Sequence, residues 1–205
     1  VDGTHYKTIW LKDNRTVQVI DQRKLPFFFE IHNMVSVADA YSAIHEMIVR
    51  GAPLIGVTAS FGMYLATLEQ PNTSGWFDRV KEAANYLKSS RPTAINLAYA
   101  VDQQLERLQN VSSQPEAVEI SKTTALTLSE KETENCRLIG EYGLPLIKEI
   151  ASRKKGEPVN ILTHCNAGWL ACIDYGTATA PIYRAHDENI KVHVWVDETR
   201  PRNQG

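Results

Sequence analysis

The first part of the chain alternates between apolar and polar positions in the way that short strands do. Between residues 6 and 29, β-branched and aromatic side chains are frequent, and the turn-forming pair Asp13-Asn14 interrupts them. This pattern predicts a small antiparallel sheet. Its expected core residues are Val17, Val19 and Ile20.

From Ser36 onward, apolar residues recur at the spacing of one face of a helix. Ser36 is itself a residue type that caps helix N-termini. The segment 53–68 is apolar on nearly all sides, so we expect its helix to be buried. The expected helices are 36–50, 53–68, 76–88, 94–109 and 115–154, the last interrupted near Gly140 and Gly143.

A different pattern begins after Pro158. Two short apolar runs, 159–163 and 192–196, flank a segment from about 168 to 186 that we expect to be one helix. This order predicts a β-α-β unit with parallel strands. Parallel sheets normally contain several strands, so we expect further chain after Gly205.

Together these patterns predict an α/β fold in two domains. Residues 1–130 would form an N-terminal domain with the small antiparallel sheet and a helical bundle. Residues 131–205 would form the first part of a Rossmann-like parallel α/β domain, incomplete in this chain because two parallel strands are too few.

Composition narrows the classes of function. Of the 205 residues, 43% are hydrophobic and 22% are charged, the formal net charge is -2, and Lys and Arg are dispersed. We therefore expect no nucleic-acid partner, and no apolar run reaches the roughly 18 to 20 residues that span a membrane. The three cysteines form no CxxC pair, so we expect neither disulfides nor a metal site. A cytoplasmic protein acting on a small molecule is expected.

Polar clusters follow both predicted parallel strands, at 163–168 and 197–202. Parallel strands share one C-terminal edge, where open α/β sheets bind ligands, so the clusters should lie together. Cys165 would stand at the start of the following helix, whose N–H groups and dipole lower a thiol pKa or bind an anion. A small buried cysteine is an equally good interpretation.

The neighbours of Cys165 leave similar alternatives. His164 can transfer protons, but a hydrogen-bonded structural histidine is more common. Asn166 either donates to a substrate oxygen or closes the turn. Asp197 and Glu198 can act as acid or base, although an ion-pair network at the strand end is the more common role.

Two arginines precede expected helix starts, in Arg50-Gly51-Ala52-Pro53 and Ser90-Arg91-Pro92-Thr93. Each motif places a guanidinium beside the backbone N–H groups that open a helix, an arrangement that holds oxyanions. Two such motifs favour a phosphate ligand, while either arginine alone is also compatible with a surface or hinge position.

Four segments together resemble one family. They are Arg50-Gly51-Ala52-Pro53 with Ile55-Gly56, residues 91–97 reading RPTAINL, residues 161–168 reading ILTHCNAG, and residues 194–205 reading VWVDETRPRNQG. In order and spacing they are similar to the methylthioribose-1-phosphate isomerase family, and they cover nearly the whole chain. The wider superfamily includes regulatory subunits of translation initiation factor 2B and ribose-1,5-bisphosphate isomerase.

The resemblance implies an aldose-to-ketose isomerisation in methionine salvage, in which 5-methylthioribose 1-phosphate becomes 5-methylthioribulose 1-phosphate without a cofactor or metal. The family's catalytic cysteine corresponds to Cys165 of HCNAG. The positions that hold substrate correspond to Arg50, Gly51, Ala52, Arg91 and Gln204.

The family's catalytic aspartate corresponds to a position downstream of Gly205, so we do not expect the 205-residue chain to isomerise the sugar alone. A fragment of a longer enzyme, a cleaved polypeptide, or a companion C-terminal polypeptide that supplies the aspartate would each fit this expectation. The resemblance also implies a homodimer formed through the C-terminal domain.

Two other functions fit the same resemblance. One is a regulatory subunit of the initiation factor 2B type, which would bind a sugar phosphate or nucleotide without reaction; the intact HCNAG segment argues against it. The other is isomerisation of ribose 1,5-bisphosphate. An apolar pocket would favour the methylthio sugar. Candidates for its lining are Tyr6, Trp10, Phe61 and Trp169, with core packing as the more common role for each.

Overall fold

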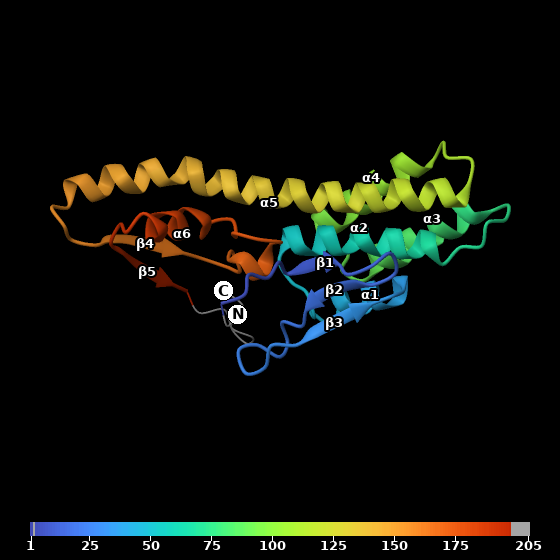
Figure 1. The fold of residues 1–205 in the computed structure, drawn as a ribbon, viewed down its shortest axis with the longest axis horizontal. Helices are drawn as coiled ribbons and strands as arrows, with labels where there is room; N and C mark the ends of the chain where they lie inside the picture. The colour runs from blue at the N-terminus through green and yellow to red at the C-terminus, as the bar shows by residue number, and fades with distance from the viewer. Residues whose placement is uncertain (2, 198–205) are drawn as a thin grey trace. The chain divides into compact units, whose positions relative to one another are not determined.

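The fold is described from a computed structural model, covering residue 1 and residues 3–197 (Figure 1). The chain divides into two compact units, Val1–Glu130 and Lys131–Gly205. No helix in the described part of the chain is both long enough and apolar enough to cross a membrane.

The first unit opens with a three-stranded antiparallel sheet in the order β1-β2-β3. Its strands are β1 (Ile9–Leu11), β2 (Val17–Ile20) and β3 (Ile31–Met34), drawn in blue in Figure 1. The expected core is confirmed, because Val17, Val19 and Ile20 are fully buried. The third strand lies beyond the expected range of 6–29, since the chain turns between β2 and β3.

Four helices complete the body of this unit. They are α1 (Val37–His45), α2 (Ala52–Leu68), α3 (Trp76–Ser89) and α4 (Ile95–Leu108). The apolar helix α2 is central and packs against the other three. Burial on all sides of α2 confirms the prediction from its sequence.

Helix α1 begins as predicted and ends earlier than predicted. Ser36 accepts a hydrogen bond from the N–H of Asp39, whose carboxylate accepts from the N–H of Ser36, so the two residues form a capping box. The helix ends at His45 because Met47 adopts a left-handed φ of 62°, and the expected continuation to residue 50 is wrong. Ile48 still enters the core, from a loop.

Helix α5 (Gln114–Arg153) begins in the first unit and ends in the second. The expected interruption near Gly140 and Gly143 is wrong, because the helix continues through both (Figure 1). The glycines instead make room for α6 (Ala180–Asp187). A β-carbon on Gly143 would lie 2.8 Å from the β-carbon of Pro181, closer than such atoms approach.

This close approach predicts that Gly143→Ala destabilises the second unit by about 1–3 kcal/mol, because α5 and α6 must move apart. The midpoint of thermal or urea unfolding measures the effect. Lys131→Ala, at an exposed position of the same helix, is the control and should change stability by less than about 0.5 kcal/mol. Helix propensity alone favours alanine by about 1 kcal/mol, so a stabilised Gly143→Ala variant would contradict the packing argument.

The second unit contains the predicted parallel strand pair. Strands β4 (Val159–Thr163) and β5 (Val192–Val196) pair in register from Val159 opposite Val192 to Thr163 opposite Val196. Its core joins α5, β4 and α6 through Leu144, Ile147, Val159 and Ala185. The α/β architecture is therefore confirmed.

The connection between the two strands differs from the single helix expected over 168–186. It contains a short 3-10 helix, η1 (Trp169–Ala171), and then α6. Between them Tyr175 and Gly176 have φ angles of 64° and 85°, which interrupt any helix. Pro181 lies in the first turn of α6, a favoured place for proline.

Candidate active site

The ends of β4 and β5 meet at one edge of the parallel pair, as the strand order predicts. The N–H of Asp197 donates to the carbonyl of Thr163 at 3.4 Å, which extends the pairing one step past the strands. Beyond it, Nδ1 of His164 hydrogen-bonds the carboxylate of Asp197. The two polar clusters are thus joined by a side-chain contact, while the part of the second cluster from Glu198 onward lies outside the described residues.

Cys165 occupies an exposed turn directly after β4, with a left-handed φ of 63°. The turn is anchored on its far side at Ala167, whose carbonyl accepts from the N–H of Thr177 at 2.9 Å and the hydroxyl of Thr179 at 3.0 Å. The element that follows is the three-residue η1, so a long helix with its dipole directed at Cys165 is not present, and that expectation is wrong. The alternative of a buried cysteine is also wrong, because the thiol is exposed.

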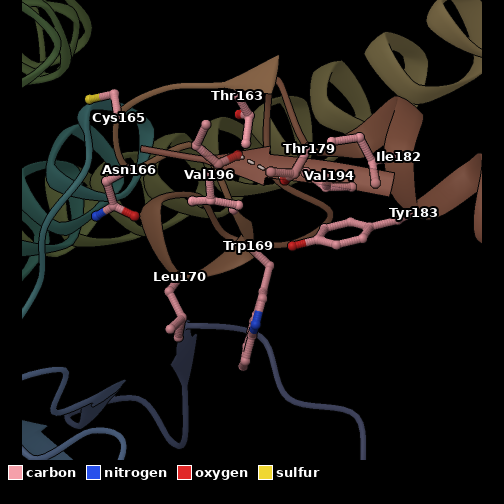
Figure 2. A pocket seen from close by; sticks show the side chains of 12 residues that line it. Thr163, Cys165, Asn166, Trp169, Leu170, Thr179, Ile182, Tyr183, Val194 and Val196 are labelled. Carbon is pink, nitrogen blue, oxygen red and sulfur yellow. Dashed lines mark hydrogen bonds between the residues drawn. The ribbon is translucent and has the colours of Figure 1, made fainter. Parts of the chain in front are cut away.

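A cavity of about 420 Å³ lies against this turn (Figure 2). Its walls combine strand-end residues with residues of η1, α6 and β5: Thr163, Cys165, Asn166, Ala167, Gly168, Trp169, Leu170, Thr179, Ile182, Tyr183, Val194 and Val196. Figure 2 shows Cys165 and Asn166 at one end, separate from the aromatic rings of Trp169 and Tyr183. The cavity is therefore mostly apolar, with a thiol and an amide at one side.

Two polar atoms of the cavity wall are buried without a hydrogen-bond partner among the described residues. They are the hydroxyl oxygen of Thr163 and the amide nitrogen of Asn166. A buried polar group without a partner costs about 1–3 kcal/mol, so such groups usually meet a ligand or water. Both residues adjoin the His164-Cys165 dipeptide, so this is the polar end of the cavity.

The other two cysteines have a different environment. Cys136 and Cys172 are buried and form one small core cluster with Ala171. A hydrogen bond with Cys136, together with burial, raises the pKa of the Cys172 thiol, which keeps it protonated. Of the three thiols, Cys165 alone is open to a ligand or a reagent.

In the first unit, the loop before α2 has the geometry of an anion-binding turn. Gly51 has a φ of 94°, which a residue with a side chain rarely adopts, and Ala52 begins the helix. The first N–H groups of a helix have no partner within it, so this turn presents donors. Arg50 is only 9% exposed, and its Nε donates to Oε1 of Gln22 at 3.1 Å, which fixes the guanidinium.

The start of α4 lies beside the start of α2. A β-carbon on Gly56 would lie 3.0 Å from the carbonyl oxygen of Asn96, so glycine allows α2 to approach the first turn of α4 closely. Arg91 precedes α4, and its Nη1 is buried without a hydrogen-bond partner within the described residues. Two helix N-termini, Arg50 and an unsatisfied guanidinium of Arg91 therefore belong to one end of this helical layer.

Comparison with known proteins gives the family. The model of the initiation factor 2 subunit family matches residues 48–205, which is most of the chain. The chain belongs to the initiation factor 2 subunit family. This match includes both arginine motifs, the Cys165 turn and the whole parallel pair.

Curated relatives of this family member are isomerases. The chain is 49% identical over its whole length to the methylthioribose-1-phosphate isomerase of Desulfatibacillum aliphaticivorans, and 53% identical to that of Sinorhizobium medicae. It covers 56% of each of these relatives, so the chain spans about half the length of the curated relatives it matches. The resemblance expected from the four motifs is confirmed.

Two solved structures share the fold. The 5-methylthioribose 1-phosphate isomerase of Pyrococcus horikoshii OT3 matches with a TM-score of 0.84 and 30% identity, over 98% of this chain and 55% of that one. The translation initiation factor eIF-2B subunit delta of A. fulgidus matches with a TM-score of 0.82 and 33% identity, over 98% and 57%. Enzymes and initiation-factor subunits of the family therefore share this architecture.

The structure adds residues that the sequence did not single out. Gln22 orients Arg50, Thr179 anchors the Cys165 turn, and Tyr183 lines the cavity. A polar Asp-Gln-Arg run directly after a strand was the only sequence signal for Gln22. Of the candidates for apolar lining, Trp169 lines the cavity and Phe61 is buried core.

Three further points concern residues proposed from the sequence. Gln204 lies outside the described residues. Asn96, within the RPTAINL segment, has its backbone oxygen and β-carbon 3.0 and 3.3 Å from the place that a β-carbon on Gly56 would occupy. Within residues 1 and 3–197, no group of three or more His, Cys, Asp or Glu side chains is arranged to hold a metal ion.

Proposed function

We propose that the chain forms part of a methylthioribose-1-phosphate isomerase, which converts 5-methylthioribose 1-phosphate to 5-methylthioribulose 1-phosphate. The observation that carries this proposal is the exposed thiol of Cys165, at the polar end of an apolar cavity in a chain about half identical to named isomerases. A family member that only senses a ligand has no need of an exposed thiol at the strand end.

The reaction moves a hydrogen from C2 to C1 of the sugar. The phosphate on the anomeric oxygen prevents spontaneous ring opening, so the enzyme must assist cleavage of the bond between C1 and the ring oxygen. We assign this assistance to Cys165, which moves a proton or stabilises charge as the ring opens. Such interactions are stronger beside apolar walls than in water.

We assign phosphate binding to the first unit. Gly51 and Ala52 supply backbone donors at the start of α2, and Arg50 and Arg91 supply guanidinium groups. The unsatisfied Nη1 of Arg91 supports this role, because a phosphate oxygen would give it the partner that it lacks. Gln204 is proposed as a further substrate contact on the strength of its motif.

Protection of Cys165 from alkylation tests the proposal without requiring turnover. Iodoacetamide should modify Cys165 and leave the buried Cys136 and Cys172 unmodified in the folded protein. We expect 5-methylthioribose 1-phosphate to slow this modification at least about tenfold at saturation, because the bound sugar would cover the thiol. Ribose 1,5-bisphosphate is the comparison ligand, and its second phosphate has no counterpart in the apolar cavity.

A second candidate is a regulatory subunit, because the fold also matches an initiation factor subunit with a TM-score of 0.82. Such a protein would protect Cys165 with a nucleotide or sugar phosphate and convert neither. Protection by a nucleotide alone would contradict the isomerase proposal, whereas conversion of the methylthio sugar would contradict the regulatory one.

A further inference from the structure

The side-chain contact between His164 and Asp197 lies where the strand pairing ends. The last paired residues are Thr163 and Val196, and one more backbone bond joins Asp197 to Thr163. The next contact is the hydrogen bond between Nδ1 of His164 and the Asp197 carboxylate. Cys165 comes directly after this contact.

The backbone of Cys165 needs support on both sides. A left-handed φ costs a non-glycine residue about 1–2 kcal/mol, so such a conformation persists only where its surroundings hold it. On the C-terminal side, the Ala167 carbonyl is held by Thr177 and Thr179. On the N-terminal side, the corresponding support is the pair of His164 and Asp197.

We propose that His164 and Asp197 are a positioning pair that holds the Cys165 turn in its reactive conformation. The inference rests on the proposed function of Cys165. Nδ1–H of the imidazole donates to the carboxylate, which fixes the ring and links the start of the turn to the end of β5. In sequence, Asp197 is followed by the segment that contains Gln204, which lies outside the described residues.

Exposure of the pair makes the proposal testable. The side chains of His164 and Asp197 are 65% and 53% exposed. An exposed pair contributes about 0–1 kcal/mol to folding, so its removal should leave the protein folded. A lower kcat in such folded variants would then indicate that Cys165 has moved from its reactive position.

Four variants show whether the hydrogen bond to Asp197 matters or only the presence of a histidine at position 164. His164→Asn keeps an N–H donor near the place of Nδ1, whereas His164→Gln carries its donor farther from the backbone. Asp197→Ala removes the acceptor. His193→Asn is the matched control, because His193 lies exposed on β5 and its ring contacts Trp195.

We expect His164→Gln and Asp197→Ala to lower kcat about tenfold or more with KM changed less than about threefold, since small misplacements of a reacting group cost rate more than binding. His164→Asn should restore most of kcat, and His193→Asn should match the wild-type protein. A purely structural role would lower thermal stability and would not give this rescue. Unchanged kcat in both disruptive variants would overturn the proposal.

Hydrogen exchange of the backbone amides of residues 164–168 provides a readout that needs no turnover. Exchange in this segment should be faster in His164→Gln and Asp197→Ala than in the wild-type chain, and unchanged in the two asparagine variants. If wild-type protein of the relatives' full length does not isomerise the sugar, the proposed function fails, and the exchange data still decide whether the pair holds the turn. Equal exchange in all variants would refute the positioning role.

Discussion

Cys165→Ala should lower kcat for 5-methylthioribose 1-phosphate by about three orders of magnitude or more, because it removes the thiol assigned to ring opening. Alanine is smaller than cysteine and the site is an exposed turn, so we expect little change in folding. Initial rates of ketose formation at saturating sugar measure the effect. KM should change much less than kcat, since the phosphate contacts remain.

Cys136→Ala is the matched control for this variant. This variant also removes a thiol group, but from a buried position outside the apolar cavity. The free energy of unfolding should therefore fall by about 1–2 kcal/mol while kcat stays near the wild-type value. Full activity in Cys165→Ala would exclude the thiol from catalysis. Equal loss in both variants would indicate a general effect of cysteine removal.

Arg91→Met should lower kcat/KM by about 10²-fold, equivalent to about 2–3 kcal/mol, mainly by raising KM. The reason is the buried Nη1 of Arg91, a residue shortly before α4, which has no hydrogen-bond partner among the described residues. A phosphate oxygen placed there would accept a charge-assisted hydrogen bond. Steady-state kinetics with the sugar phosphate measure the change.

Two further variants serve as a control and as a conservative replacement. Arg107→Met removes an exposed arginine from the last turn of α4 and should leave kcat/KM unchanged. Arg91→Lys keeps the charge and loses the planar fork, so it should fall between wild type and Arg91→Met. An unchanged KM in Arg91→Met would contradict phosphate binding by this residue.

Local patterns predicted the elements that position the site. The segment that is apolar on nearly all sides predicted α2 as a buried helix, and the Ser36 capping signal predicted the start of α1. The two apolar runs gave β4 and β5, and parallel pairing then required their polar ends to meet. The topology explains why the chain near His164 meets the chain near Asp197. Which two side chains form a hydrogen bond there could not be predicted from the sequence.

The errors arise where tertiary contacts override local signals. Gly143 is a weak helix former, yet α5 continues through it because α6 packs closely there. Met47 carries a helical pattern, yet its left-handed backbone ends α1. Residues 172–179 were expected to be helical, whereas the φ of 85° at Gly176 fits a turn whose N–H and side chains anchor Ala167.

The turn at residues 172–179 changes the explanation of the reactivity of Cys165. A helix over 168–186 would have placed a dipole at the thiol. The structure provides instead an apolar cavity, an Asn166 amide with no partner among residues 1 and 3–197, and an anchored turn. Reactivity at Cys165 is therefore attributed to its position and its neighbours. The anchoring residue Thr179 and the cavity residues Tyr183 and Val194 are distant from Cys165 in sequence, so periodicity could not have revealed them.

Turnover of 5-methylthioribose 1-phosphate, with the intact mass determined on the same purified sample, decides whether the protein is an isomerase. We expect conversion to the ketose in a sample of the relatives' length, a loss of that conversion in Cys165→Ala, and little or no conversion of ribose 1,5-bisphosphate. Binding of the sugar without conversion in a sample of that length would contradict the isomerase assignment and would favour a ligand-sensing subunit.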